Sequence, residues 1–600
     1  MSDTLLSPAS VTPPSAGPGA GASEASVSEI PAAERERLDV VIDRARAAST
    51  RWAALSLADR AALLRDVHQA TSRAAQTWAQ TACELKGVPF TSAYAGEEWM
   101  SGPYAMLAGT GTLAHSIDAL ASGRSPLAGA NFEEAPGDRT AVKILPRTPI
   151  EWTLLNGFSG EVWLRPGVTP AEAVARAGLA QRDPQAVGGV GLVLGAGNIT
   201  SIAPLDALSE LFAHNRTVVL KLNPITERMM QPLTIALWPL ILEGYVQLVQ
   251  GGASEGEYLV SHAGIDHIHI TGSAATHDAI VWGTGDEAAR RRQADSPRVT
   301  TPISSELGGV APVIIVPGQW SSADLRFQAE HVATMRLHNG GHNCIAGQVV
   351  IVSADWPQRE EFLAHLREAL RTAPRRTPWY PGSTTRLQAA ASAYPQSDPI
   401  AIERGESNGC LVDLTTAGDP SILETTEYFA PIMGAVSVPG TGAEFLKAAI
   451  AHANDKLAGT LGANVLIDPT TRKKLGARFR ELIAELRYGT IAINTWTAFG
   501  FLSPAATWGA YPGSTIADVG SGIGMVHNAL LIDDVERTVV TGPFRPFPRS
   551  IAGGELSLFP KPPWFVTARS AAATGKQLAG FAAKPGWLRL PGVFAAAFRA

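Results

Sequence analysis

The sequence has few cysteines, no excess of basic residues and no long apolar run. Its three cysteines, Cys83, Cys344 and Cys410, are too few and too scattered for a disulfide framework or a structural zinc site, which fits a reducing compartment. A formal charge of -6 argues against a nucleic-acid partner. No apolar run can cross a bilayer, and the N-terminus lacks the basic and apolar regions of a secretory signal. These absences predict a cytoplasmic protein without a transmembrane segment.

What the chain does contain is typical of a large globular protein. Its 600 residues are too many for one ordinary domain, and 45% hydrophobic with 17% charged residues can build a sizeable core. Residues 1–33 are rich in Ser, Pro, Gly and Ala, which predicts a disordered N-terminal tail. Apolar residues at helical spacing follow up to about Leu85, and residues 170–184 are typical of an inserted helix.

From about residue 187 to 438 short apolar strands alternate with amphipathic helices. Such alternation predicts right-handed βαβ crossovers and an α/β fold with two doubly wound, Rossmann-like parallel sheets. The predicted strands include Gly189–Leu194, Val218–Leu222, Tyr245–Val249, His267–Thr271, Val313–Val316 and Val349–Val352. Ligands of open parallel sheets bind beyond the carboxyl ends of the strands, so functional groups are expected there.

A different pattern lies between residues 141 and 168. Two β-rich runs, Trp152–Leu155 and Glu161–Leu164, flank the turn-forming segment Asn156–Gly160, which predicts a β-hairpin. Near the C-terminus, Val535–Val540 alternates like an edge strand that could pair with this hairpin.

The stretch of greatest chemical interest contains Cys344, after an Asn-Gly-Gly turn and before an apolar run. A thiol on such a turn can act as a nucleophile if its pKa is lowered, whereas an isolated cysteine is more often a small buried hydrophobic residue. His338, His342 and Cys344 could also bind a metal ion, but the glycines between the histidines argue against the helix that would align them.

The order of several motifs extends this interpretation. These motifs are Gly191–Asn198, Val218–Pro224, Ile270–Ser273, Ser305–Gly309, Leu337–Gln348, Glu427–Pro431, Ala453–Asp455 and Ile491–Asn494. Together they resemble the NAD(P)-dependent aldehyde dehydrogenase superfamily, over about residues 36–543. The resemblance implies an NAD(P)-binding domain over 34–312, interrupted by an oligomerisation hairpin at 141–168, and a catalytic domain over 313–500. Residues 501–543 would return to the cofactor domain with an oligomerisation strand, leaving 544–600 as a C-terminal extension.

The resemblance also implies catalytic roles. The thiolate of Cys344 would attack an aldehyde, giving a thiohemiacetal and, after hydride loss, a thioester. Asn198 would stabilise the oxyanion, although an asparagine there could simply cap the helix expected from Ile199. Glu306 would activate the water that hydrolyses the thioester, although it could also be an ordinary solvated acid.

For the cofactor, NAD or NADP, the resemblance points to five residues. Gly272 and Ser273 precede the helix whose N-terminus would meet the pyrophosphate. Lys221 would bind the adenosine ribose, Glu427 the nicotinamide ribose, and Phe429 would pack near the nicotinamide ring. From the residues alone, Lys221 could equally be a solvated strand-end lysine and Phe429 a core residue.

The sequence departs from the family pattern at three positions, one of which is the absence of the glycine usual a few residues beyond Gly272, with His277 nearby. Pro224 replaces the acid that commonly selects NAD, so the sequence leaves NAD and NADP open. His342 replaces a common glutamine before the cysteine. Trp496, Phe499 and Phe501 could line an apolar substrate channel or belong to the core.

Two alternative functions, and two roles for the C-terminal extension, remain open from the sequence. A coenzyme A-dependent acylating relative generally lacks an acid at Glu306, so this residue favours hydrolysis. A catalytically silent binding protein is disfavoured by the joint presence of Cys344, Glu306 and Asn198. The extension 544–600 holds eight basic residues, one acid and interleaved aromatics, so it could contact a membrane surface or wrap its own enzyme. The expected partners are a small aldehyde and a second copy of the chain, in a homodimer or tetramer.

Overall fold

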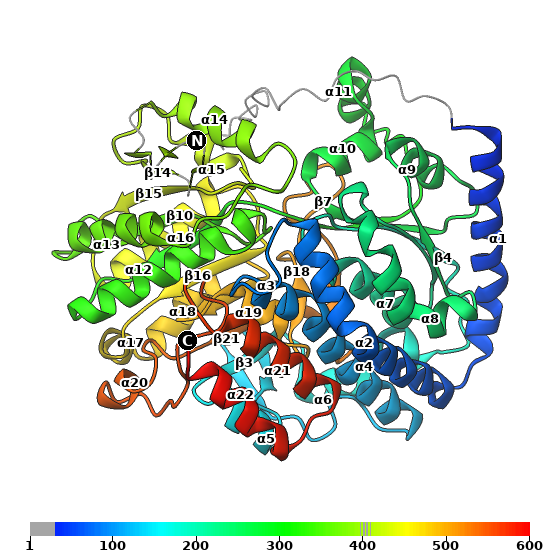
Figure 1. Cartoon of the computed structure of the whole chain (residues 1–600), viewed down its shortest axis with the longest axis horizontal. Helices are drawn as coiled ribbons and strands as arrows, with labels where there is room; N and C mark the ends of the chain where they lie inside the picture. The colour runs from blue at the N-terminus through cyan, green and yellow to red at the C-terminus, as the bar shows by residue number, and fades with distance from the viewer. Residues whose placement is uncertain (1–29, 396–397, 400–401, 404–405, 408–409) are drawn as a thin grey trace, which may run out of the picture.

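The computed structural model of the chain describes residues 30–395, 398–399, 402–403, 406–407 and 410–600. Two large β-sheets lie beside each other, each covered by helices (Figure 1). The predicted N-terminal tail lies outside the described residues, except that helix α1 already begins at Ala32. Among the described residues, no helix combines the length and the apolar character needed to cross a membrane.

The first sheet has six strands in the order β19-β8-β7-β4-β5-β6, parallel except for β19. Its strands are β4 (Val190–Leu194), β5 (Thr217–Lys221), β6 (Val246–Val249), β7 (His267–Gly272), β8 (Ile303–Leu307) and β19 (Gly522–Ile523). The four predicted strands from 189 to 271 are confirmed. Their side chains are almost all buried, as expected for parallel strands covered on both faces.

The second sheet has eleven strands in the order β1-β2-β3-β21-β17-β16-β9-β10-β15-β14-β11. The parallel part comprises β9 (Ala311–Ile315), β10 (Gly347–Ser353), β14 (Cys410–Asp413), β15 (Ile432–Val438), β16 (Gly462–Leu466), β17 (Thr490–Ile493) and β21 (Val535–Thr541). The antiparallel strands are β1 (Phe132–Ala135), β2 (Arg139–Leu145) and β3 (Ser159–Leu164) at one edge and the short β11 (Asp398–Pro399) at the other.

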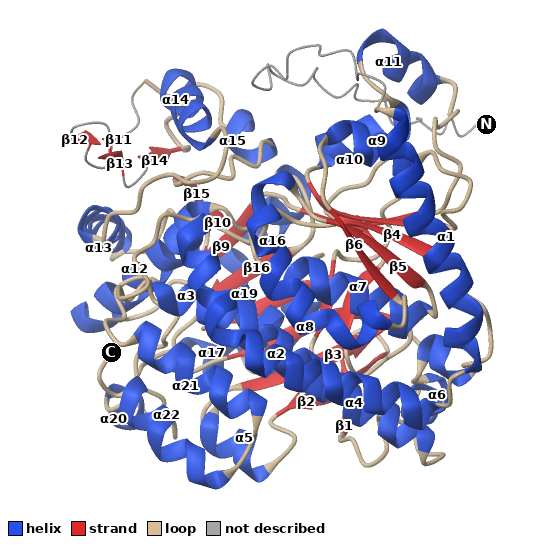
Figure 2. Ribbon diagram, turned by 45° about the vertical axis from the view of Figure 1, so that its right-hand side comes forward, coloured by secondary structure: helices blue, strands red, loops and turns tan. Residues whose placement is uncertain are grey.

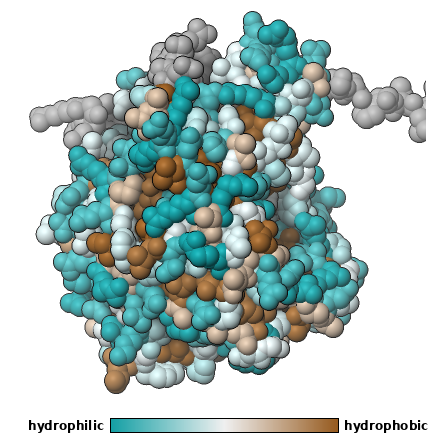
Figure 3. All heavy atoms as spheres, turned by 90° about the vertical axis from the view of Figure 1, so that its right-hand side faces the viewer, coloured by the Kyte–Doolittle hydropathy of each residue, from teal (hydrophilic) through white to brown (hydrophobic). Residues whose placement is uncertain are grey.

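Helices cover both sheets (Figure 2). The first sheet packs against α1 (Ala32–Ala54), α2 (Leu57–Leu85), α4 (Ala105–Ala121), α7 (Ile202–His214) and α8 (Met230–Leu242). The second packs against α12 (Ser322–Leu337), α13 (Arg359–Thr372), α16 (Gly442–Lys456) and α18 (Ala477–Glu485). The predicted α/β class with two parallel sheets is therefore confirmed. On the face shown in Figure 3, hydrophilic side chains surround smaller apolar patches.

The predicted hairpin is wrong in one arm. Residues 149–154 form helix α5 (Pro149–Leu154), and the strand that pairs with β3 is β2 instead. The helix starts here because the Thr148 side chain accepts a hydrogen bond from the Glu151 N–H, with Pro149 at the first helical position. A helix-start signal therefore outweighs the β-rich composition of the segment.

The predicted edge strand is also wrong. Strand β21 is interior: it pairs antiparallel with β3 and parallel with β17 of the same chain. The hairpin and the C-terminal strand do meet, but they complete a sheet within one chain. Neither β3 nor β21 therefore leaves an unpaired edge in this chain.

The C-terminal extension folds back over the molecule. Helix α21 (Ala571–Ala583) packs on α3 (Ala95–Trp99) at a small-residue crossing, where a Cβ on Gly96 would lie 2.4 Å from the Ala571 backbone. Helix α22 (Leu590–Ala597) packs against α21 and, with it, against α5. Trp564 and Phe565 are buried, whereas Trp587 and Leu588 are exposed. Most of the extension thus wraps the protein itself.

Candidate active site

Cys344 lies in a turn between a helix and a core strand. Helix α12 ends at Leu337, the 3-10 turn η4 (His338–Gly341) follows, and β10 begins at Gly347. Asn339, Gly340 and Gly341 all have positive φ angles, of 56°, 68° and 80°. At Gly341 a Cβ would also lie 3.0 Å from the Ala430 carbonyl carbon, so both conformation and space require glycine. This tight turn fixes the direction of the cysteine.

A buried ion network anchors the turn to the N-terminal helices. The Lys86 ammonium lies 2.9 Å from Glu98 and donates a hydrogen bond of 3.1 Å to the Asn339 side chain. The Glu97 carboxylate accepts a hydrogen bond of 3.1 Å from the Asn339 N–H and also pairs with the Arg376 guanidinium. All five side chains are buried, and removing one charge would leave its partner uncompensated. The turn is therefore held from two sides.

The Cys344 thiol lies beside the Glu306 carboxyl group, at the end of β8, close enough for each group to act on the pKa of the other. Burial raises the pKa of Glu306 to about 7, although the nearby Cys344 thiol and the hydrogen bond from the Trp508 indole (3.3 Å) oppose the shift. Burial also raises the pKa of the Cys344 thiol well above its usual value, and the nearby acids Glu306 and Glu427 add to this. The structure thus gives a neutral thiol beside a base, in place of the lowered thiol pKa considered from the sequence.

Asn198 belongs to the same site. Its side-chain amide donates a hydrogen bond of 3.0 Å to the His342 carbonyl, two residues before Cys344. Helix α7 begins only at Ile202 and its N-cap is Ser201, so Asn198 does not cap this helix. Asn198 and Cys344 line one cavity of about 50 Å³, together with Trp496, Phe501 and other apolar residues. Phe499 is not among the residues of this cavity.

Glu427 and Phe429 lie in the segment before β15 of the eleven-stranded sheet and border the site on that side. A Cβ at Gly308 would lie 2.0 Å from Glu427 Oε1, so the glycine after β8 makes room for this carboxyl group. Burial raises the pKa of Glu427 to about 8, with Arg336 opposing the shift. Its buried Oε1 atom has no hydrogen-bond partner among the described residues. The ring of Phe429 lies 4.9 Å from that of Tyr380.

Lys221, Gly272 and Ser273 lie at the carboxyl edge of the six-stranded sheet. The ammonium of Lys221, at the end of β5, donates a hydrogen bond of 2.5 Å to the Gly251 carbonyl. Gly272 ends β7, and the Ser273 side chain caps helix α10 (Ala274–Trp282) by accepting from the Thr276 N–H at 3.1 Å. Gly272 pairs with Leu307 in the sheet register, one residue after Glu306. Lys221, Gly272 and Ser273 therefore border this edge, whereas Glu427 and Phe429 lie on the side of Cys344.

A buried polar row beside Glu306 was missed in the sequence. His269 and Thr271 of β7 share a sheet face with Glu306, and Thr271 donates a hydrogen bond of 2.8 Å to Asp206 of α7. His527 contacts the other Asp206 oxygen at 3.0 Å. Burial alone would raise the pKa of Asp206, but His269, 3.7 Å away, and His527 outweigh it and keep that pKa low. The alternating His-x-His-x-Thr run on a predicted strand was the available signal.

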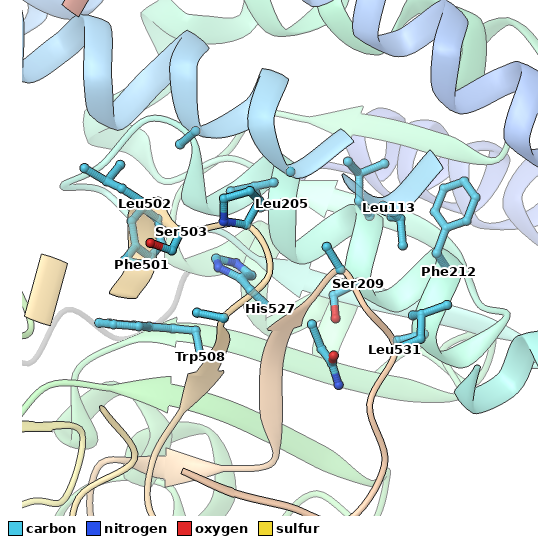
Figure 4. Close-up of a pocket in the computed structure, with 18 of the residues that line it drawn as sticks. Leu113, Leu205, Ser209, Phe212, Phe501, Leu502, Ser503, Trp508, His527 and Leu531 are labelled. Atoms are coloured by element: carbon cyan, nitrogen blue, oxygen red, sulfur yellow. The ribbon is translucent and has the colours of Figure 1, made fainter. Parts of the chain in front are cut away.

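Next to this row lies a second small pocket, of about 60 Å³, between α4, α7 and residues 500–508 (Figure 4). Phe501, Trp508 and His527 lie together on one side of it, and Leu113 and Phe212 lie further along (Figure 4). Phe501 and Trp508 also line the Cys344 cavity. These two aromatic side chains therefore separate the two spaces.

Comparison with known proteins identifies relatives over part of the chain. An aldehyde dehydrogenase of Enchytraeus buchholzi is 26% identical over 277 residues, 44% of this chain and 50% of that protein. The 3,6-anhydro-alpha-L-galactose dehydrogenase of Streptomyces coelicolor is 30% identical over 142 residues, 24% of this chain and 25% of that protein. The matched segments thus span half or less of the length of these relatives.

Solved structures agree over most of the fold. An NADP-dependent glyceraldehyde-3-phosphate dehydrogenase from Bacillus halodurans, complexed with NADP, has a TM-score of 0.57 at 18% identity, over 85% of this chain and 91% of that chain. Aldehyde dehydrogenase C from Pseudomonas syringae, in complex with NAD+ and octanal, has a TM-score of 0.56 at 18% identity, over 85% and 90%. The sequence itself matches the aldehyde dehydrogenase family over residues 20–108 and 166–393, just over half of its length. The chain belongs to the aldehyde dehydrogenase family.

Proposed function

We propose that this protein oxidises an aldehyde to a carboxylic acid with NAD or NADP, through a covalent intermediate on Cys344. The observation that carries the proposal is the proximity of Cys344 and Glu306, which act on each other's pKa, beside the cavity that Cys344 and Asn198 line. A thiol with a raised pKa needs a neighbouring base to become a nucleophile, and Glu306 is that base.

Cys344 and Glu306 act in successive steps of the proposed reaction. The Cys344 proton passes to Glu306 while the sulfur bonds to the carbonyl carbon, giving the oxyanion of a thiohemiacetal. A bound oxidised nicotinamide dinucleotide supplies the hydride acceptor. Hydride loss converts the adduct on Cys344 into a thioester. Glu306, after release of its proton, takes a proton from water as the hydroxyl adds to the thioester carbon, and the Cys344 sulfur leaves.

Asn198 is proposed to stabilise the oxyanion of these adducts. Replacing it with alanine should lower kcat by about two to three powers of ten, the usual effect of losing one oxyanion-hole donor. Asn198→Asp is the matched variant, because it keeps the size of the side chain and removes the N–H donor. Steady-state kinetics should show both variants impaired; a kcat near that of the wild type in either would remove the assignment.

The cofactor residues fit a dinucleotide. The unpartnered Glu427 Oε1 offers an acceptor for a ribose hydroxyl, beside a glycine that leaves it room. Lys221 would hold the other ribose, and the N-terminus of α10 at Gly272 and Ser273 would hold the pyrophosphate. Phe429 would pack near the nicotinamide. We accordingly assign residues 34–312 to cofactor binding and 313–500 to catalysis, with residues 501–543 returning to the first unit.

We expect NAD to be preferred over NADP. Although Pro224 replaces the usual acid, Glu227 and Glu255 both lie close enough to Lys221 to act on its pKa. Their carboxyl groups accept hydrogen bonds from the N–H groups of Gly251 and Gly252, at 3.1 and 2.6 Å. A 2′-phosphate would meet this negative charge. An aldehyde panel assayed with both cofactors should give a kcat/KM about 10- to 100-fold higher with NAD; an equal or higher value with NADP would contradict the expectation.

The same panel tests the alternatives. Turnover that requires coenzyme A would indicate an acylating enzyme, and no turnover with any aldehyde would indicate a silent binding protein. Glu306, the buried acid beside Cys344, favours hydrolysis of the thioester over the acylating and the silent alternatives. Because the mechanism needs a free thiol, we place the protein in the cytoplasm, acting on a small aldehyde. A homo-oligomer remains our proposal.

A further inference from the structure

A large cavity lies under the C-terminal extension. It has a volume of about 620 Å³ and is enclosed by α4, the segment from β2 to α5, and helices α21 and α22. We call it the extension chamber. A volume of this size is typical of sites for drug-sized ligands. The chamber therefore has room for far more than the carbonyl group of a substrate.

Its inner wall is apolar. Leu107 of α4, Leu578 and Phe581 of α21 and Phe594 of α22 all line it. The lining residues with ionisable side chains are more accessible: His115 and Arg147 are exposed, Glu151 is half-buried, and Lys143 is half-buried and paired with Glu161. The chamber thus has an apolar interior and a polar mouth.

The chamber adjoins the Cys344 cavity. Met100, Leu502 and Trp564 line both spaces, so their side chains form the wall between them. Met100 opens the π-helix η1 (Met100–Tyr104), a type of distortion frequent at functional sites. Methionine is also the most adaptable apolar side chain. Met100 is therefore the part of this wall that we expect to move aside.

We propose that the extension chamber binds the hydrocarbon chain of a long, unbranched aliphatic aldehyde while its carbonyl group reacts at Cys344. This substrate class rests on the proposed function and specifies it. The Cys344 cavity has a volume of only about 50 Å³. We therefore expect a narrow methylene chain to reach it past Met100 more readily than an aromatic ring next to the carbonyl. The extension supplies Trp564, Phe581 and Phe594 to the chamber, so it acts as a specificity-determining element of the enzyme.

The test compares straight-chain aldehydes from propanal to dodecanal, with benzaldehyde as the aromatic probe. For the wild-type chain, kcat/KM should rise by about fourfold for each added methylene until the chamber is filled, because each buried methylene adds that much binding. Benzaldehyde should be a poorer substrate than hexanal, which has nearly as many carbon atoms.

Two variants fill the chamber from opposite sides: Ala108→Phe on α4 and Ala597→Phe on α22. Each should lower the ratio of kcat/KM for dodecanal to that for propanal by about 10- to 100-fold. Ala121→Phe is the matched control, because Ala121 is exposed at the end of α4 and is not part of the chamber lining. It should keep the wild-type ratio. Propanal oxidation by each variant reports that it is folded.

The outcomes separate the two proposals. If propanal is oxidised well but kcat/KM does not rise with chain length, or the filled variants keep the wild-type ratio, the chamber proposal is overturned and the proposed function stands. If benzaldehyde outperforms hexanal, the chamber proposal is also overturned. If no aldehyde is oxidised with either cofactor, the proposed function fails first and the chamber proposal with it.

Discussion

Cys344→Ala is expected to lower aldehyde oxidation by a factor on the order of 10⁶, as removal of a covalent nucleophile does in other enzymes. The sulfur is the group to which the substrate bonds, whereas the Cys83 thiol is buried in helix α2, near Glu98 and Lys86. Activity is followed by the absorbance of the reduced nicotinamide. Mass spectrometry of the protein after exposure to aldehyde and cofactor should show no acyl adduct in the variant.

Cys83→Ala is the matched control for this experiment. Burial raises the pKa of the Cys83 thiol to about 12, so this residue has no thiolate to offer. Its replacement removes a buried sulfur at similar cost in packing, and activity per folded molecule should stay near that of the wild type. Activity of Cys344→Ala within about tenfold of the wild type would exclude a covalent mechanism at this residue.

Glu306→Gln is expected to slow both the formation of the thioester and its hydrolysis, because the amide can take a proton neither from Cys344 nor from water. Reduced cofactor should form about 10²- to 10⁴-fold more slowly in the first turnover and in the steady state, the range for loss of a general base. The amide keeps the size of the side chain, and the hydrogen bond to Trp508 can be replaced. Rapid-mixing absorbance measures both phases.

The same residue predicts the pH dependence. Glu306 works as a base only when ionised, and burial raises its pKa to about 7. Below that pH the carboxyl group holds its proton, so the hydrolysis rate should rise with pH through about 7 and level off above it. This step should be absent from the residual rate of Glu306→Gln. Persistence of the same step in the variant would assign the titration to another group.

Glu424→Gln provides a matched control for Glu306. Glu424 is also buried, and it contacts His452 at 2.8 Å, away from the residues that line the Cys344 cavity. Its variant should form reduced cofactor at rates near those of the wild type, in the first turnover and in the steady state. If Glu306→Gln behaves in the same way, Glu306 is not the group that activates water.

Much of the fold could be predicted because its signals are local. Strands such as β4 and β7 are short apolar runs bounded by helices, and their period is visible in a few residues. The turn before Cys344 was visible as well, since Asn339, Gly340 and Gly341 are the residues that adopt positive φ most readily. The roles of Cys344, Glu306 and Asn198 could be predicted only from the family resemblance. Residues so distant in sequence give no local indication that they lie close together in the fold.

What could not be predicted depends on distant partners. An alternating strand looks the same at an edge and in the interior, so Val535–Thr541 gave no indication that both its sides are paired. The raised thiol pKa of Cys344 depends on burial and on two acids from other strands. At Trp152 the strand prediction was wrong because it followed the β-rich composition, although the Thr148–Glu151 helix start is visible in the sequence.

The interior position of β21 also has a consequence for biosynthesis. Arg139 at the start of β2 pairs with Glu536 of β21, 397 residues later in the chain. While the ribosome makes the residues between them, β3 exposes an unpaired, largely apolar edge that is prone to join other chains. The growing polypeptide can close its sheet only when it is almost complete, so a cell that makes this enzyme must shield the β3 edge until the last strand arrives.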